Sequence, residues 1–425
     1  KYWDLPVLDK KNDPGEKQIL KETEELLKET VRQHLMSDVP LGAYLSGGLD
    51  SSLLVALISG FTKERVKTFS IGFEEKGYDE FEPARQVANL FNTEHHEIIL
   101  KGQDYLSLIP EVIRIKDEPL SIPNEIAVYL LSKELKKHIS VVLSGEGADE
   151  LFGGYGRIFR SGFDWERMRL LKNGRLDSSI EQGLINNLNE KYGDWQQMSE
   201  LEHFLGQYQY FDVKEKKNIL NNEFFSLNHD NIQNQSFFSA LFDKLKDLSA
   251  SDKYLYIFQK IHLLAPLRRL DANTMSSSVE ARVPFVDHKL VEFVSALPLH
   301  YKLAWKSARH KEKARSLNST QISEEFDTTK YLLKKIAAKY LPENIINRKK
   351  VGFPVPLNSF FGGEFRNFSR EILLAKDSKS NCLYDQEILK SWLDRQDLLS
   401  DTRCGYSIWM MINMELWLRE YNVSL

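Results

Sequence analysis

The side chains best suited to chemistry lie in one short run, Ser46-Gly47-Gly48-Leu49-Asp50-Ser51-Ser52. Its two glycines let the backbone turn tightly and approach a ligand closely. A helix is expected to follow, and its free N–H groups and positive dipole end attract phosphate, with Ser51 and Ser52 as extra donors. Asp50 would repel phosphate unless a cation lay between them, so it predicts Mg²⁺. A simple Gly/Ser turn with a serine N-cap is the alternative, and the strand–turn–helix context favours the phosphate loop.

A second polar run, Ser144-Gly145-Glu146-Gly147-Ala148-Asp149-Glu150, directly follows a short apolar stretch. Its three carboxylates within five residues are costly unless water or a cation compensates them. A solvated acidic turn before a helix is the alternative interpretation, since acidic residues suit the positive end of a helix. However, polar loops that follow two parallel strands face one crevice. We therefore expect the two runs to form one site.

Strands and helices must hold these runs in place. Short apolar stretches that predict buried strands cover residues 39–45, 66–73, 97–100 and 139–143. Helical patterns cover 51–59, 79–91, 105–115 and 125–137, and an amphipathic helix over 16–37 precedes them all. This alternation predicts an α/β fold, a doubly wound parallel sheet with helices on both faces and right-handed crossovers.

The strand patterns fade after Gly154, and from residue 253 onward the chain is typical of helices with capped turns. We therefore predict an α/β lobe over residues 1–155 and a mostly helical lobe over 156–425 that completes the site. The stretch 307–329, which is basic at first and then acidic, is expected to be an inserted loop.

Composition narrows the class of protein. A net charge of −4 over 425 residues argues against a nucleic-acid partner. Cys382 and Cys404, the two cysteines, form neither a disulfide framework nor a zinc motif, so a reducing compartment is expected. We find no apolar run long enough to span a bilayer and no signal-peptide pattern. The expected location is therefore the cytoplasm, without membrane attachment.

Several motifs resemble a known family. The 46–52 loop lacks the Walker lysine and resembles the pyrophosphate loop of the ATP pyrophosphatases, which split ATP into AMP and pyrophosphate. The run from Ser144 to Tyr155 resembles the glutamine-hydrolysing asparagine synthetases. So do four further blocks in the family's order: Thr68-Phe69-Ser70-Ile71-Gly72-Phe73, Asp117-Glu118-Pro119, Glu280-Ala281-Arg282-Val283-Pro284-Phe285-Val286-Asp287 and Arg348-Lys349-Lys350-Val351-Gly352-Phe353. The resemblance covers nearly the whole chain and implies an adenine-nucleotide α-hydrolase-like fold.

The resemblance also implies roles for individual residues. It implies that ATP is held by Leu45, Ser46, Gly47, Gly48, Asp50, Ser51, Ser52, Ile71, Ser144 and Gly145. Asp50 and Asp149 would bind Mg²⁺, and Glu146 would act on the aminated intermediate as a base for ammonia. Lys350 would neutralise charge that develops on the phosphates. Without the resemblance, Lys350 would be interpreted as a surface lysine.

The reaction implied is an ATP-dependent ligation, in which the side-chain carboxylate of aspartate is adenylated and ammonia from glutamine converts it to asparagine. An alternative keeps this chemistry but changes the acceptor to a sugar carboxylate, or closes a ring as β-lactam synthetases and lasso-peptide cyclases do. Glu146 argues against the β-lactam synthetases, which have Tyr at that place. A tRNA-modifying thiolase would need cysteines near the loops, and Cys382 and Cys404 lie far from them in the sequence. The intact Asp50, Glu146, Asp149 and Lys350 argue against a non-enzymatic scaffold. For Glu280 and Arg282 the sequence allows two roles, a structural ion pair or a contact with the substrate.

The first residues carry a further expectation. Tyr2-Trp3-Asp4-Leu5-Pro6 resembles the junction that follows the glutaminase domain in the family, and Lys1 is not a start residue. We expect the natural protein to be longer, with an N-terminal glutaminase domain that supplies ammonia and is absent from this chain. Tyr2, Trp3 and Leu5 would then belong to an exposed apolar patch. A homodimer is one assembly that the sequence allows.

Overall fold

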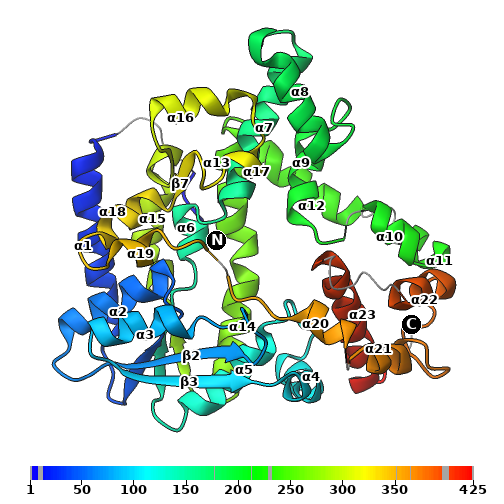
Figure 1. The fold of residues 1–425 in the computed structure, drawn as a ribbon, viewed down its shortest axis with the longest axis horizontal. Coiled ribbons are helices and arrows are strands. Elements are labelled where there is room, and N and C mark those ends of the chain that lie inside the picture. Colours follow the sequence, from blue (N-terminus) through cyan, green and yellow to red (C-terminus); the bar gives the residue numbers. More distant parts are fainter. Residues whose placement is uncertain are drawn as a thin grey trace.

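A five-stranded parallel sheet lies at the centre of the α/β part of the molecule (Figure 1). The computed structural model describes residues 2–7, 13–176, 178–211, 213–227, 232–350, 352–363, 365–394 and 402–423. The strands are β1 (Leu41–Tyr44), β2 (Lys67–Phe73), β3 (Glu94–Leu100), β4 (Val141–Leu143) and β5 (Glu280–Arg282). Their order is β3-β2-β1-β4-β5, and every neighbouring pair is parallel.

Helices cover both faces of this sheet, which confirms the predicted doubly wound fold. Side chains of successive residues on a strand point to opposite faces, and the buried residues separate accordingly. Ala43 packs with Leu53 and Val87 from α2 (Leu49–Phe61) and α3 (Phe81–Leu90). On the other face, Phe69 and Val142 pack with residues of α5 (Glu125–Leu135). The amphipathic helix expected at 16–37 is α1 (Glu16–His34), and α4 (Gly102–Lys116) lies between β3 and α5 in the chain.

Helices dominate the rest of the described chain, as the sequence predicts (Figure 1). The first group comprises α6 (Ala148–Phe152), α7 (Gly156–Lys172), α8 (Ser178–Tyr192), α9 (Glu200–Tyr208), α10 (Val213–Ile219), α11 (Asn222–Leu227), α12 (Ile232–Lys244), α13 (Ala250–Ile257) and α14 (Leu264–Met275). The second comprises α15 (His288–Ser295), α16 (Ala308–Lys313), α17 (Ser319–Ile322), α18 (Tyr331–Ala337), α19 (Glu343–Ile346), α20 (Leu357–Gly362), α21 (Phe365–Leu373), α22 (Gln386–Asp394) and α23 (Thr402–Glu420). None of the described helices is both long and apolar enough to cross a bilayer.

Three strands occur where helices or the 307–329 loop were expected. β5 completes the central sheet, although its residues Glu280-Ala281-Arg282 form no apolar run. Pairing with β4 creates this strand, because the N–H of Glu280 donates to the carbonyl of Ser140 and that of Ser144 to the carbonyl of Arg282. A separate antiparallel pair joins β6 (Leu303–Trp305) to β7 (Asp327–Thr329). The division into lobes at residue 155 stays a prediction, and the central sheet takes one strand from beyond that point.

The stretch 307–329 is a folded segment and not the inserted loop that its charges suggest. The Ser307 side chain caps α16, and Asn318 forms a capping box at α17. Asp327 is buried and accepts a hydrogen bond from Arg160 Nε at 2.9 Å. The same guanidinium lies 4.0 Å from the centre of the Trp305 ring. These contacts fix β7 against α7, and the buried charge of Asp327 is compensated by Arg160.

The start of the described chain only partly matches the apolar patch that was expected. Tyr2 is fully exposed and Trp3 is 43% exposed, but Leu5 is buried in the main core. The indole N–H of Trp3 donates to Glu292 at 2.7 Å, and Asp4 pairs with Lys244 at 3.1 Å. Leu5 therefore does not belong to an exposed patch, because its side chain anchors this segment to the core.

Candidate active site

Two polar loops meet at the point where the strand order reverses. In the sheet, β2 and β3 lie on one side of β1, whereas β4 and β5 lie on its other side. A crevice therefore forms beside the loops after β1 and β4, which is where ligands bind in open α/β sheets. The loops touch one another closely, since a Cβ on Gly145 would lie 3.2 Å from the backbone nitrogen of Ser51.

The loop after β1 has the backbone that its glycines predicted. Gly47 has φ +69°, and an added Cβ would lie 2.4 Å from the carbonyl carbon of Pro83 on α3, so only glycine fits there. The hydroxyls of Ser46 and Ser51 lie 3.0 Å apart, and the N–H of Gly48 donates to the Ser46 hydroxyl at 3.2 Å. Ser52 is fully buried on α2.

A compact cluster of charges occupies the crevice. Lys330 Nζ lies 2.5 Å from Asp50 Oδ2 and 2.7 Å from Asp149 Oδ1. Lys350 Nζ lies 2.6 Å from Asp149 Oδ1. Lys330 thus joins the two carboxylates, and Lys350 adds a second, more exposed ammonium group at Asp149.

This arrangement shifts the pKa values of the cluster. Burial disfavours the charge on Asp149, but Lys330 and Lys350 outweigh that effect and hold the pKa of Asp149 below its usual range. Burial raises the pKa of Asp50, and although Lys330 opposes this, the charge of Asp149 adds to it. Burial opposes the charge on Lys330, yet the two carboxylates raise the pKa of Lys330 well above the ordinary value. The lysine is therefore charged at neutral pH.

Lys330 was not found by sequence reasoning, although it contacts both aspartates. It lies between β7 and α18 with φ +51°, in the left-handed region that a non-glycine residue rarely occupies. Its side chain crosses Gly154, where an added Cβ would lie 2.4 Å from Lys330 Cε. No motif marks it in the sequence, and the charges of the 307–329 segment that precedes it predict a loop.

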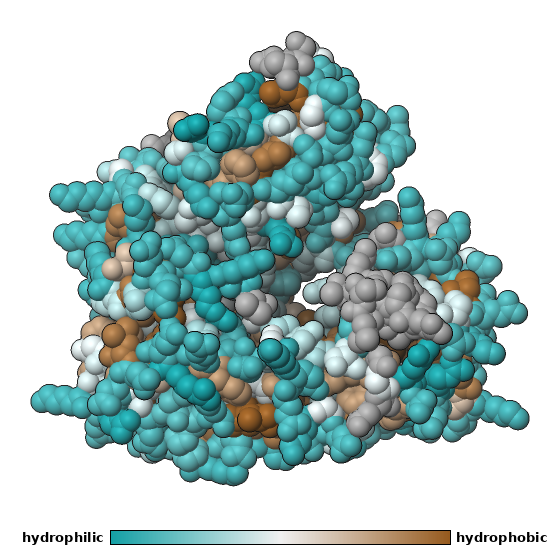
Figure 2. Space-filling view, viewed as in Figure 1, coloured by the Kyte–Doolittle hydropathy of each residue, from teal (hydrophilic) through white to brown (hydrophobic). Residues whose placement is uncertain are grey.

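A cavity of about 910 Å³ opens beside the charge cluster. Ten of the predicted site residues line it: Leu45, Ser46, Asp50, Ser51, Ile71, Ser144, Gly145, Glu146, Asp149 and Lys350. Gly47, Gly48 and Ser52 shape the loop behind its wall and are not among the lining residues. Tyr208, Arg269 and Tyr406 bring α9, α14 and α23 to the cavity, and Figure 2 shows the surface hollowed between the upper helices and those at the lower right.

The cavity wall differs in chemistry from one part to another. One end is apolar, where Leu45, Ile71, Val128 and Leu131 surround a space between the sheet and α5. Elsewhere on the cavity wall, Arg269 of α14 forms an ion pair with Glu146, and its second nitrogen donates to Asn124 at 2.8 Å.

Next to Glu146 stands a wall of aromatic and titratable side chains. Tyr155 donates to Glu150 at 2.8 Å, and Lys350 Nζ lies 4.2 Å from the centre of the Tyr155 ring. Burial, with the charge of Asp149, raises the pKa of Glu150 to about 7. Burial, with the charge of Lys350, lowers the pKa of His262 to about 4. The His262 ring is therefore neutral near pH 7.

Glu280 and Arg282 lie outside the cavity lining. They form an ion pair at 2.7 Å, and Arg282 also donates to the carbonyls of His34 and Met36, at 2.7 Å each. Since Glu280 is exposed and Arg282 is bound to the end of α1, their contacts are structural, and they fasten β5 to that helix.

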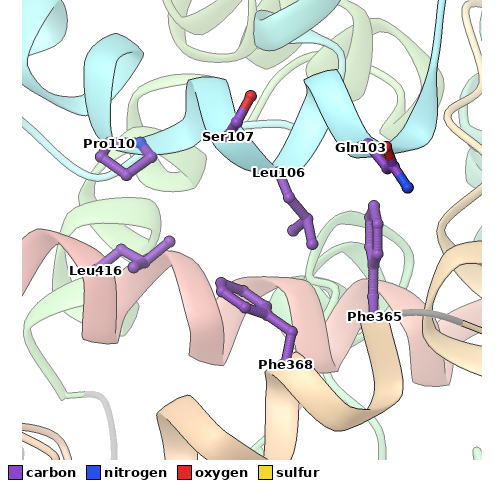
Figure 3. Close-up of a pocket in the computed structure, with 7 residues that line it drawn as sticks. All are labelled: Gln103, Leu106, Ser107, Pro110, Phe365, Phe368 and Leu416. Carbon is purple, nitrogen blue, oxygen red and sulfur yellow. The ribbon is translucent and has the colours of Figure 1, made fainter.

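A second hollow, of about 430 Å³, lies between α4, α21 and α23 (Figure 3). Leu106, Phe365, Phe368 and Leu416 point into it from the three helices. The described residues that line it include no ionisable side chain. This hollow offers packing surface but no groups for acid–base or electrostatic catalysis.

The fold and the site together define a doubly wound α/β protein with a charged crevice at its switch point. The family model described as asparagine synthase matches residues 22–419. The chain belongs to this asparagine synthase family, which confirms the resemblance seen in the motifs.

Individual relatives are more distant. Asparagine synthetase [glutamine-hydrolyzing] 1 of Bacillus subtilis (strain 168) is 29% identical over 413 residues, which cover 95% of this chain and 59% of that protein. A putative asparagine synthetase [glutamine-hydrolyzing] 2 of Methanocaldococcus jannaschii is 43% identical over 155 residues, 36% of this chain and 30% of that protein. The chain thus spans little more than half the length of the first of these relatives. Among solved structures, the NH3-dependent NAD synthetase of Campylobacter jejuni aligns at 17% identity with a TM-score of 0.24, over 53% of this chain and 96% of that one.

Replacing Lys330 by Met should destabilise the chain in a pH-dependent way. Asp50 and Asp149 would then share the half-buried crevice with only Lys350 as partner, so we expect a loss of about 3 kcal/mol in the free energy of unfolding. Without Lys330, burial and mutual repulsion raise the folded-state pKa of the pair above the unfolded value. A group with a raised folded pKa favours folding as the pH falls, so the deficit should be larger at about pH 8 than at about pH 5.

The measurement is urea unfolding of the wild type and the Lys330→Met variant at both pH values. Lys335→Met, at an exposed position on α18, is the matched control and should be close to the wild type. A Lys330→Met deficit that grows as the pH falls would contradict the assigned charge balance.

Proposed function

We propose that this chain adenylates a carboxylate with ATP and then converts the adenylate to an amide with ammonia. The observation that carries the proposal is the meeting of Asp50, Asp149, Lys330 and Lys350 at the switch point, beside a loop that has no Walker lysine. Membership of the asparagine synthase family supports aspartate as the acceptor and asparagine as the product. The curated relatives are named glutamine-hydrolysing, which supports glutamine, acted on by a glutaminase domain, as the source of ammonia. A cytoplasmic location and a homodimer stay predictions.

The cavity suits ATP in one orientation. The apolar end around Leu45 and Ile71 would receive adenine, because a flat aromatic base gains most from apolar walls. The β- and γ-phosphates would then reach the loop after β1, where the N–H groups at the start of α2 lie and where the hydroxyls of Ser46 and Ser51 could exchange their mutual hydrogen bond for one to phosphate. Lys330 and Lys350 would hold the phosphates by charge.

The aspartates also suit Mg²⁺, which prefers carboxylate oxygens. Asp50 Oδ1 is buried and has no hydrogen-bond partner among the described residues, so it retains a free acceptor toward the crevice. Asp50 and Asp149 would hold the ion, as the sequence predicted. When bound, Mg²⁺ neutralises negative charge on the phosphate oxygens.

In the first proposed step a carboxylate oxygen of the acceptor attacks the α-phosphorus of ATP. The bond from that phosphorus to the bridging oxygen of the β-phosphate breaks, and pyrophosphate leaves with the electron pair. Lys350 and Lys330 compensate the charge that develops on the leaving group. The pyrophosphate would stay in the charged crevice until the second step is complete.

In the second step ammonia attacks the acyl carbon of the adenylate. The C–O bond to AMP breaks, AMP leaves, and the extra proton on nitrogen must be accepted by a base. Glu146 is our candidate for that base, because it lines the cavity next to the charge cluster and its partner Arg269 orients it. Arg269 would be free to bind a carboxylate of the acceptor once Glu146 turns to the reacting nitrogen.

A second acceptor class has one observation in its favour. Tyr155, Tyr208 and Phe258 line the cavity around His262, with ring centres 5.5, 5.9 and 4.6 Å from that of His262. Aromatic walls of this kind suit a larger carboxylate, such as a sugar uronic acid, better than they suit aspartate. The same adenylation and amidation chemistry would apply to either acceptor, and to a ring closure.

The proposal is tested by product analysis across a panel of acceptors. Purified chain is incubated with ATP, Mg²⁺, ammonium and either aspartate, a uronic acid or a β-amino acid. We expect AMP and pyrophosphate in a ratio of one to one, formed with the true acceptor, together with its amide. Formation of ADP and orthophosphate would contradict adenylation, whereas a response to a uronic acid alone would identify the second acceptor class.

Replacing Lys350 by Ala should slow adenylation by about a hundredfold to a thousandfold, the usual cost of removing one stabilising group. The neighbouring exposed Lys349 is the matched control, and Lys349→Ala should leave the rate nearly unchanged. Both rates are measured as pyrophosphate release at saturating ATP. Equal losses in the two variants would show that a general positive patch, and not Lys350 itself, acts on the phosphates.

A further inference from the structure

Three potential metal ligands converge on the sheet away from the proposed active site. Glu94 and His96 belong to edge strand β3, and His138 lies in the turn after α5. One ligand atom from each residue can be chosen so that all three lie within 4.8 Å of one another. Glu94 Oε1 lies 3.1 Å from His96 Nε2, and the two imidazole ring centres are 4.2 Å apart.

The fold itself brings these side chains together. Glu94 and His96 are two residues apart on β3, so they share one face of the strand. On this face α5 crosses β2 and β3, and its C-terminal turn returns His138 to the sheet. Phe69 is paired with His96 across the two strands and stacks on its ring at 4.9 Å with an angle of 14°. Neighbouring structure therefore fixes the His96 ring.

We propose that Glu94, His96 and His138 bind a divalent transition-metal ion, with zinc the ion best matched to these donors. Two imidazole nitrogens and one carboxylate oxygen are the protein ligands of many four-coordinate zinc sites, where water fills the fourth position. Ligand atoms around tetrahedral zinc lie about 3.4 Å apart, since each bond is about 2.0–2.1 Å long. The ligand atoms of the cluster lie within 4.8 Å of one another, so the side chains must shift to reach that spacing.

The surroundings leave the ligands accessible and available. All three residues are partly exposed, so an ion and its water can enter. A ligating histidine must be neutral, and an imidazole can supply either of its ring nitrogens to an ion. Lys67 Nζ donates a hydrogen bond to the backbone carbonyl of His138 at 3.3 Å. The carboxylate of Glu134, on α5, adds negative charge near His138.

The position of the cluster indicates a structural role for the ion. The ligands lie near the amino-terminal ends of β3 and β4, whereas the charged crevice follows the carboxyl ends of β1 and β4. The ion would tie the edge strand to the connection between α5 and β4. Because α5 also carries Val128 and Leu131 of the cavity wall, the metal would stiffen the scaffold behind the apolar end of the cavity.

The test is a calorimetric titration of the metal-free, tag-free chain with zinc chloride in the presence of excess Mg²⁺. We expect one zinc ion per chain, bound more than about tenfold more weakly in His96→Gln and in His138→Gln, since changing even an outer partner of a zinc site weakens it about 10–100-fold. His288→Gln is the matched control, because His288 is an exposed histidine beside one carboxylate, Asp287 at 3.9 Å.

Cobalt(II) gives a second readout that does not depend on activity. Its visible d–d absorption should appear with the wild type and the His288→Gln variant, and should be lost with His138→Gln. His138 is partly exposed in a turn, so this variant should keep its fold, which circular dichroism checks. Absence of saturable zinc binding, or zinc binding that is unchanged in both His96→Gln and His138→Gln, would overturn the proposal.

Discussion

The site depends on one buried lysine that lies between two half-buried aspartates. Asp50 and Asp149 come from different loops, and without a cation between them their charges would repel in a medium of low dielectric constant. Lys330 contacts both carboxylates, and Lys350 adds a second positive charge at Asp149. The two loops, the start of α18 and the segment around Lys350 must therefore be held in fixed relation to one another. An incoming triphosphate would replace some of these ion pairs with its own contacts to Lys330 and Lys350.

Two parts of the fold supply that fixed relation. The parallel sheet places the ends of β1 and β4 side by side, so that the two aspartates face the same crevice. The 307–329 segment places Lys330, because β7 pairs with β6 and Asp327 is bound by the buried Arg160 of α7. The helical part of the chain is thus needed to complete a site that begins on the sheet.

Local patterns in the sequence predicted the sheet side of this site. Short apolar runs predicted four of the five strands of the sheet, and helical patterns predicted the helices between them. The Gly/Ser and acidic turns that follow two of these runs predicted that the two loops converge. β5 could not be predicted in this way, because Glu280-Ala281-Arg282 becomes a strand only through its pairing with β4. Lys330 was missed because it meets Asp50 across 280 residues of chain, and a lone lysine after a polar stretch carries no local signal. Lys350 was recognised only through its motif.

The most direct test of the central claim is isotope exchange between labelled pyrophosphate and ATP, measured without ammonia. If the charged crevice holds pyrophosphate while a carboxylate is adenylated, label should enter ATP only when Mg²⁺ and the acceptor are present. The Lys330→Met variant should lose this exchange at a pH where it is still folded. Exchange from labelled orthophosphate instead, or undiminished pyrophosphate exchange in the Lys330→Met variant, would contradict the account.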